Sequence, residues 1–183
     1  PTTSSAASDV YKRQDREFKG SSNIDMMLDS ELEEGIKEPS FLTKLDALEA
    51  FLEKQEKSGK IVGYLDQLKQ IRKAFSDNKK EFYKIPDSKP MTSQLLLLFE
   101  NSGPDDDLSD IKDFDERFTR ITLPTINMDA SEYNQFLDDM MQTINKDFPD
   151  LNVTPTGPMV MFQAQNGYTL SLIHISEPTR RNS

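Results

Sequence analysis

The chain lacks most of the side chains that carry catalysis or hold metals. Its 183 residues include no cysteine, no tryptophan and a single histidine. Without cysteine, a disulfide framework, a thiol nucleophile and every cysteine zinc site are excluded. Long hydrophobic runs are also missing, because the longest, residues 95–99, has five residues where a membrane helix needs about 20.

The chain also has few positively charged residues relative to its negative ones. Lys and Arg number 22 against 32 Asp and Glu, which gives a net charge of −10. A nucleic-acid binder needs clustered cations to neutralise phosphates, so the sequence predicts no nucleic-acid partner. Docking on anionic lipid is disfavoured for the same reason. The length suits one or two small domains with a real core.

The two ends of the chain are related through DNA rather than through protein structure. Residues 9–14 read Asp-Val-Tyr-Lys-Arg-Gln, and residues 170–175 read Leu-Ser-Leu-Ile-His-Ile. Back-translated as GAT GTG TAT AAG AGA CAG, the first has a reverse complement that encodes the second. This inverted repeat resembles the mosaic end of a transposon-based sequencing adapter. We therefore interpret 1–14 and 170–183 as adapter-derived tails that contribute nothing to the fold, and 15–169 as the interpretable chain.

The tails also hold the only histidine. Removing their four cations and two anions leaves 18 Lys and Arg against 30 Asp and Glu, and His174 leaves with them. Residues 15–169 thus lack both His and Cys, which excludes Ser-His-Asp and Cys-His catalysis and nearly all zinc or copper sites. The sequence predicts no catalytic residues, no cofactor and no metal.

Hydrophobic periodicity predicts an α+β fold with helices on one face of a sheet. Two βαβ units, at about 22–64 and about 117–157, flank a helical insertion at about 65–116, and residues 158–169 lead onward. The expected elements are a strand over 22–29, a helix from Pro39 stopped by Ser58-Gly59, a strand over 61–63, a helix over 64–75, a buried helix over 91–100, a strand over 117–123 ending at Pro124, a helix capped by Asp129 and Glu132, and a strand over 151–156.

The apolar stripes of two helices predict the core. We expect six side chains to be largely inaccessible: Leu45, Leu48, Leu52, Phe136, Leu137 and Met140. The many carboxylates are expected to lie in water near their ordinary pKa values.

Residues 105–116 have the spacing of a calcium-binding EF-hand loop in part. Oxygen side chains stand at five ligand positions, which are Asp105, Asp107, Ser109, Asp113 and Glu116. However, Asp110 stands where the sharp turn requires glycine, and Lys112 where an apolar residue is usual. A solvated acidic loop and helix start is the better interpretation, and no metal is predicted.

Other clusters have a structural interpretation as well. Glu33-Glu34 and Asp138-Asp139 could do acid–base work, but adjacent carboxylates are expected by number alone in so acidic a chain. Methionines could form an adaptable surface for apolar ligands, although a core role is favoured for most of them: Met26, Met27, Met140, Met141, Met159 and Met161. Gly157 alone is no phosphate loop.

Several blocks resemble an extracytoplasmic loop of the resistance-nodulation-division (RND) superfamily of exporters, in the branch of the mycobacterial-membrane-protein-large type. They are Ile-Asp-Met-Met-Leu-Asp at 24–29, Gly-Ile-Lys-Glu-Pro at 35–39, Leu-Asp-Ala-Leu at 45–48, Gly-Lys-Ile-Val-Gly-Tyr at 59–64, Tyr-Lys-Ile-Pro-Asp-Ser at 83–88, Gln-Leu-Leu-Leu-Leu-Phe-Glu at 94–100 and Thr-Pro-Thr-Gly-Pro at 154–158. The likeness runs from about residue 22 to 167 and is closer to the second large loop than to the first. Pro155 departs from the usual spacing of the last block.

The resemblance implies a porter-like domain of two ferredoxin-like βαβ units on the outer, periplasmic side of the inner membrane. The parent would be a proton-driven exporter of lipid-like or amphiphilic compounds. Its partners would be that substrate and the membrane helices of the same chain, with a homo-oligomer left open. Residues 158–169 would lead to the next membrane helix, which makes Met159, Met161 and Phe162 candidates for the substrate path and its coupling to the membrane. The family's proton-relay carboxylates lie in membrane helices, so none is transferred to this chain.

Two alternatives remain at this point. The same βαβ pattern allows a free-standing extracytoplasmic binding or interaction module, and the acidic pairs allow a hydrolase. DNA beyond Thr169 would encode a membrane helix for the exporter and a stop codon for the module. A hydrolase would need two carboxylates converging in a concave pocket with shifted pKa values.

Overall fold

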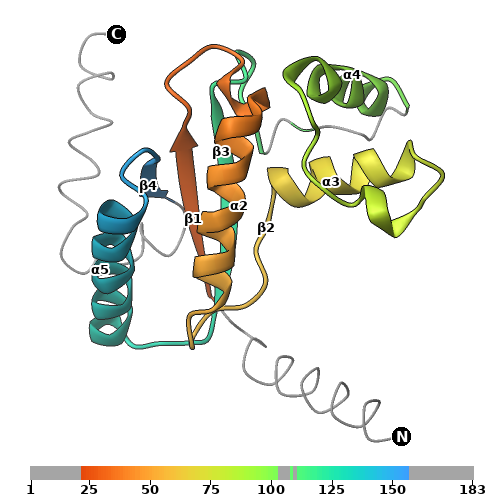
Figure 1. Ribbon diagram of the computed structural model, residues 1–183. Coiled ribbons are helices and arrows are strands. Elements are labelled where there is room, and N and C mark those ends of the chain that lie inside the picture. Colours follow the sequence, from red (N-terminus) through yellow and green to blue (C-terminus); the bar gives the residue numbers. More distant parts are fainter. Residues whose placement is uncertain (1–21, 103–107, 109–110, 157–183) are drawn as a thin grey trace, which may run out of the picture.

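The computed structural model describes residues 22–102, 108 and 111–156 (Figure 1). Its elements are β1 (Ser22–Asp29), the 3-10 helix η1 (Gly35–Lys37), α2 (Pro39–Glu53), β2 (Val62–Gly63), α3 (Tyr64–Ala74), the 3-10 helix η2 (Lys80–Phe82), α4 (Lys89–Glu100), β3 (Phe118–Thr125), α5 (Ala130–Asp147) and β4 (Asn152–Thr156). The predictions made for the two tails and for 158–169 lie outside the described residues.

Four antiparallel strands form one sheet in the order β2-β3-β1-β4. The segments β1-α2-β2 and β3-α5-β4 are interleaved, because each has a strand of the other between its own two strands. Strands β1 and β3 pair along eight residues each and form the centre of the sheet. The α+β class predicted from periodicity is confirmed.

The core lies between the sheet and the helices. Alternate residues of the central strands point inward and are fully buried, among them Ile24, Met26 and Ile121. Figure 1 shows α2 lying over β1 and β3, and α5 beside β4. The inward side chains form one cluster with Leu45 and Leu48 of α2 and with residues of the other helices. This cluster is the single core of the described residues.

The helical insertion forms a lobe beside β2, in which α3 and α4 lie against each other (Figure 1). The buried guanidinium of Arg72 on α3 donates to the carbonyl oxygen of Ile85 at 2.5 Å and to Oδ2 of Asp87 at 3.0 Å. This charged side chain therefore holds the connector between η2 and α4 onto α3. In the described ranges, no helix has the length and apolar content that crossing a membrane requires.

Two predicted boundaries are wrong for local reasons. Helix α2 ends at Glu53, before Ser58-Gly59, because Leu52 is the last residue of its apolar stripe and a polar run follows. Strand β3 continues through Pro124 to Thr125. The carbonyl of Pro124 accepts from the amide of Gly59 at 2.8 Å, so the side of Pro124 without an N–H faces a loop rather than a strand, and no ladder bond is lost.

Two predicted burials are wrong as well. Helix α4 is buried on one side only, with Leu97 and Leu98 exposed, because it packs on α3 and η1 with a single face. Phe136 and Leu137 of α5 are half-buried rather than inaccessible. The fully buried residues of α5 are Tyr133, Met140 and Ile144, and Phe136 and Leu137 lie beside this stripe, packed against the core but still partly in contact with solvent.

Candidate functional site

The face of the sheet opposite the core carries the candidate site. Alternation along β1 turns Asp25, Met27 and Asp29 away from the helices, and pairing sets Arg120 opposite Met27. The complete set, which we call the open face, is Asn23, Asp25, Met27, Asp29, Val62, Phe118, Arg120, Thr122, Pro124, Asn152, Thr154 and Thr156. Methionine, valine and phenylalanine give this face apolar area between its charges.

One ion pair on the open face is built around Asp25, whose residue is only 3% exposed. Its carboxylate accepts from Nη2 of Arg120 and, at 2.6 Å, from Oγ1 of Thr122. Both donors come from β3, so the pairing of β1 with β3 assembles the group. A buried carboxylate needs such partners, because an unpaired one would be strongly destabilising.

A second ion pair lies at the end of β1. Arg117, just before β3, donates from Nε to Oδ1 of Asp29 at 2.7 Å and from Nη2 to Oδ2 at 2.8 Å. This bidentate hydrogen bond to Arg117 lowers the pKa of Asp29 below its ordinary value. The charges that β1 and β3 bring to the open face are therefore neutralised in pairs within the chain.

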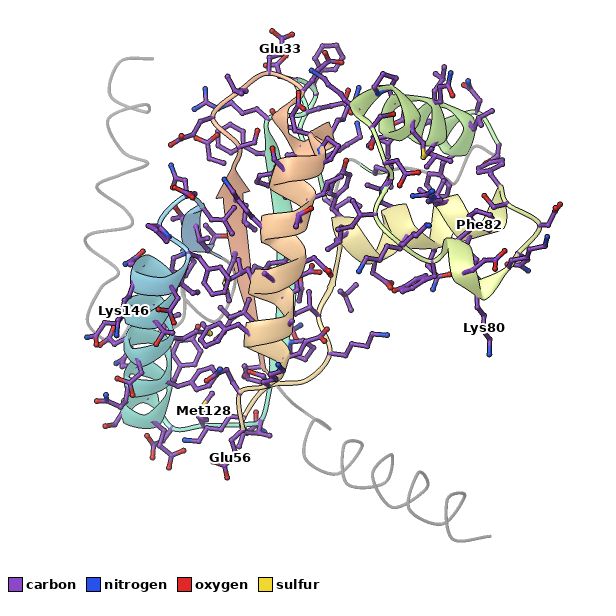
Figure 2. All side chains as sticks on the ribbon, viewed as in Figure 1. Glu33, Glu56, Lys80, Phe82, Met128 and Lys146 are labelled. Carbon is purple, nitrogen blue, oxygen red and sulfur yellow. The ribbon has the colours of Figure 1, made fainter. Side chains whose placement is uncertain are left out.

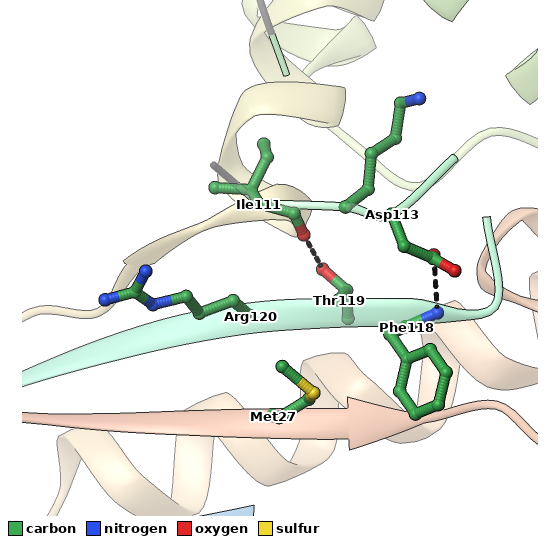
Figure 3. A pocket seen from close by; sticks show the side chains of 7 residues that line it. Met27, Ile111, Asp113, Phe118, Thr119 and Arg120 are labelled. Carbon is green, nitrogen blue, oxygen red and sulfur yellow. Dashed lines mark hydrogen bonds between the residues drawn. The ribbon is translucent and has the colours of Figure 1, made fainter. Parts of the chain in front are cut away.

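A shallow depression of about 280 Å³ lies beside these pairs (Figure 3). Its lining residues are Met27, Ile111, Lys112, Asp113, Phe118, Thr119 and Arg120. Residues 111–113 form its rim because they fold back onto β3, where the amide of Arg120 donates to the carbonyl of Ile111 at 3.0 Å. The sequence predicts a loop and helix start here and gives no indication of this contact; the helix start is wrong, because residues 111–117 form turns held by β3.

The polar groups in the depression already have partners in the chain. As Figure 3 shows, Oγ1 of Thr119 donates to the Ile111 carbonyl at 2.8 Å, and Oδ1 of Asp113 accepts from the Phe118 amide at 2.9 Å. Lys112 pairs with Glu100 and Glu116. What the depression can offer a ligand is therefore mainly apolar contact with Met27, Ile111 and Phe118.

The carboxylates considered for chemistry do not converge. Asp138 and Asp139 are exposed on α5, and Asp139 accepts from Gln135. Glu34 is exposed and pairs with Lys37 and Lys89. In the described part of the chain, no three His, Cys, Asp or Glu side chains are placed to hold a metal ion.

The EF-hand-like segment is described only in part. Its first positions, Asp105 and Asp107, lie outside the described residues, as do Ser109 and Asp110. The two described carboxylates at ligand positions bind protein groups, since Asp113 accepts backbone amides and Glu116 binds Lys37 at 2.8 Å.

The methionines fall into three groups. Met26 and Met140 are core residues, as predicted, whereas Met27 is exposed and Met141 half-buried. The candidate coupling residues Met159, Met161 and Phe162 lie outside the described residues, so their role remains a prediction.

Glu49, like Asp29, contradicts the expectation of ordinary pKa values, but its pKa is shifted in the opposite direction. Glu49 is half-buried on α2, and burial raises its pKa to about 8, although Lys69 opposes this shift. The other charged groups that act on it are Glu53 and Asp46 of α2 and Asp66 of α3, all carboxylates. Lys69 is itself held by Asp46, with Nζ and Oδ1 2.8 Å apart. Sequence spacing gives no warning, because the cluster depends on how α3 lies against α2.

Comparison of the chain with protein-family models, with curated proteins and with solved structures found no match.

Proposed function

We propose that residues 22–156 belong to the extracytoplasmic domain of a proton-driven RND-type exporter, on the periplasmic side of the inner membrane. In this proposal the domain forms part of the pathway for a lipid-like or amphiphilic substrate and catalyses no reaction itself. The rest of the transporter, with its membrane helices, is its partner.

The strand order is the observation that carries this proposal. Read from the other edge it is β4-β1-β3-β2, antiparallel throughout, with α2 and α5 as the two crossover helices. This order and the two crossover helices support a ferredoxin-like, split βαβ unit, the fold that the resemblance implies for a porter-like domain. The α3–α4 lobe is then an insertion between its two halves.

The open face supports the substrate-pathway part of the proposal. Its charges are paired within the chain, and the depression beside them is lined by Met27, Ile111 and Phe118. A molecule passing over this surface contacts apolar side chains, and the charges beside them are already neutralised by ion pairs. The absence of converging carboxylates among the described residues favours a pathway or binding role over a hydrolase.

The gene beyond Thr169 tests the family assignment directly. The proposal expects a continuation that encodes about 20 apolar residues soon after Gly157. A stop codon in that position would contradict it and would favour the free-standing binding module.

Binding of an amphiphile tests the open face. Calorimetric titration of the 183-residue chain with a lysophospholipid below its critical micelle concentration should show weak binding and a negative heat-capacity change. Met27→Gln should weaken binding about fivefold, since Met27 lines the depression. Val62→Gln is the matched control, because Val62 is exposed on the same face outside the depression and its substitution should change little.

A different result would reject the substrate pathway. Equal loss in both variants would mean that the lysophospholipid binds elsewhere, and tight binding of a polar metabolite would favour the module. For Met159, Met161 and Phe162, the proposal predicts that polar substitutions lower export in the membrane-inserted parent while the protein still reaches the membrane.

A further inference from the structure

Two tight turns lie side by side at the end of the sheet where β1 finishes and β3 starts. Residues 30–35 follow β1, and residues 113–117 precede β3; we call them the paired turns. The amide of Ser30 donates to the carbonyl of Arg117 at 2.9 Å, and the amide of Glu34 donates to that of Asp115 at 2.9 Å. Backbone hydrogen bonds thus join one turn to the other.

The first turn is fixed by packing. The Oγ of Ser30 donates to the Arg117 carbonyl at 2.6 Å, and a side chain at Gly35 would bring its Cβ within 2.2 Å of that Oγ. Only glycine fits there without a shift of Ser30. The amide of Gly35 closes the turn by donating to the carbonyl of Leu32 at 2.9 Å.

The second turn is held by the side chain of Asp113. Its Oδ1 accepts from the amides of Arg117 and Phe118, both at 2.9 Å. Glu34 and Glu116, one from each turn, have left-handed backbones, and their carboxylates share Nζ of the buried Lys37 at 3.0 and 2.8 Å. The single buried cation of Lys37 therefore binds one carboxylate from each turn.

Each fixed turn presents a large apolar side chain to solvent. Phe114 is 98% exposed and Leu32 is 64% exposed. Exposed apolar side chains on a preorganised backbone lose little entropy when a partner covers them, and aromatic anchors of this kind dominate interface energies. Glu31 and Glu33, on either side of Leu32 in the chain, and Asp115, next to Phe114, are exposed carboxylates, and Figure 2 shows Glu33 pointing away from the ribbon.

The negative charge of these carboxylates indicates which kind of partner can bind the paired turns. Anionic lipid would be repelled by the carboxylates. A second copy of the chain, docked by the same surface across a two-fold axis, would set Glu33 and Asp115 against like charges. We propose that the paired turns dock a basic protein partner, in which Lys or Arg side chains surround an apolar pocket for Phe114. This proposal is independent of the exporter assignment.

A helical peptide with one Lys face and one Leu face, about 18 residues long, serves as the probe. Fluorescence anisotropy gives its affinity for the 183-residue chain at physiological salt, and amide chemical shifts locate the contact. We expect shifts at 30–35 and 113–117, and about tenfold weaker binding for Phe114→Ser. Phe75→Ser is the matched control, since Phe75 is an exposed phenylalanine at the end of α3 and should change affinity less than about twofold.

Two further peptides separate anchor from charge. Replacing Leu by Ser, or Lys by Glu, should each abolish most of the binding. The proposal would be overturned if Phe114→Ser and Phe75→Ser bound the Lys/Leu peptide with equal affinity. Chemical-shift changes spread over other acidic surfaces would overturn it as well. Self-association of the chain that is lost in Phe114→Ser would also overturn the proposal, because the occupant would then be a second copy. Binding to vesicles of phosphatidylcholine and phosphatidylglycerol that is lost in Phe114→Ser would overturn it too, because the occupant would then be a membrane. Because Phe114 lies almost wholly in solvent, its substitution should leave thermal unfolding unchanged, which confirms that the variant is folded.

Discussion

Two tyrosines of the core show how much depends on a single hydrogen-bond partner. Tyr64 and Tyr133 are both buried, and burial raises both pKa values, that of Tyr133 to about 12. Tyr64 donates from Oη to the carbonyl of Ile36 at 3.2 Å. The hydroxyl of Tyr133 finds no partner within the described ranges.

Removing the hydroxyl should therefore destabilise the protein at Tyr64 but not at Tyr133. Tyr64→Phe should lower the free energy of unfolding by about 1 kcal/mol, because the Ile36 carbonyl loses its donor. Tyr133→Phe should leave it unchanged or raise it slightly, since an unsatisfied polar atom leaves the core. Urea unfolding of the two variants measures the difference, and equal destabilisation would contradict it.

Glu49 should make stability depend on pH. Its folded pKa, about 8, lies above that of an unfolded chain, so its contribution is complete at acid pH and is lost as pH rises toward 8. Over that window, this group lowers the free energy of unfolding by about 1.4 kcal/mol per pH unit. Glu49→Gln should match the wild type at pH 4, below the pKa of 4.5 of an unfolded glutamate, and exceed it increasingly up to pH 8, in urea melts at each pH. A difference that does not vary with pH would disprove the assignment.

At the scale of elements, α2 and α5 contribute unequally to the core. Leu45, Leu48 and Leu52 of α2 are completely buried, as their spacing predicts. On α5 the same periodicity leaves Phe136 and Leu137 half-buried, because they lie beside the stripe of Tyr133, Met140 and Ile144 that packs fully into the core.

Truncation should reveal this inequality. Leu48→Ala should lower the free energy of unfolding by about 2–5 kcal/mol, because a fully buried leucine leaves a cavity. Leu137→Ala should lower it by only about 1 kcal/mol, since solvent already reaches the site. Thermal or urea unfolding of the pair would measure both values. Similar losses would place Leu137 in the core after all.

For the whole molecule, an alternating series of charges connects the α3–α4 lobe to the sheet. It runs through seven side chains in the order Glu38, Lys89, Glu34, Lys37, Glu116, Lys112 and Glu100. Lys37 lies at its centre and is buried. Burial disfavours its charge, but hydrogen bonds with Glu116 and Glu34 outweigh this and raise its pKa.

Replacing Lys37, at the buried centre of the series, should destabilise the protein far more than replacing Lys89, which is nearer the surface. Lys37→Met should lower the free energy of unfolding by about 3 kcal/mol, because Glu116 keeps a charge with no cation at Lys37 to balance it. Lys89→Met, at a partly exposed position of the same series, should lower it by less than about 1 kcal/mol. Hydrogen exchange of α4 should rise in the first variant only. Equal effects would mean that the series contributes little.

The sequence by itself determined the elements and the class of the fold. Strand period over 22–29, Pro39 at a helix start and the Asp129 cap each act through neighbours a few residues away. Asp129 accepts from the amide of Glu132 at 2.8 Å, the local contact that the spacing predicts. Such short-range effects can be read from one chain without knowing its partners in space.

Only the tertiary structure decided the strand order, the open face and the buried charges. Asp25 meets Arg120 across 95 positions of sequence, and Asp29 meets Arg117 across 88. No pattern near Asp25 or Glu49 indicates burial, because it comes from strand register in the first case and from helix packing in the second. Leu97 and Leu98 of α4 are exposed for a related reason, since a helix buries only the face for which another element supplies a surface.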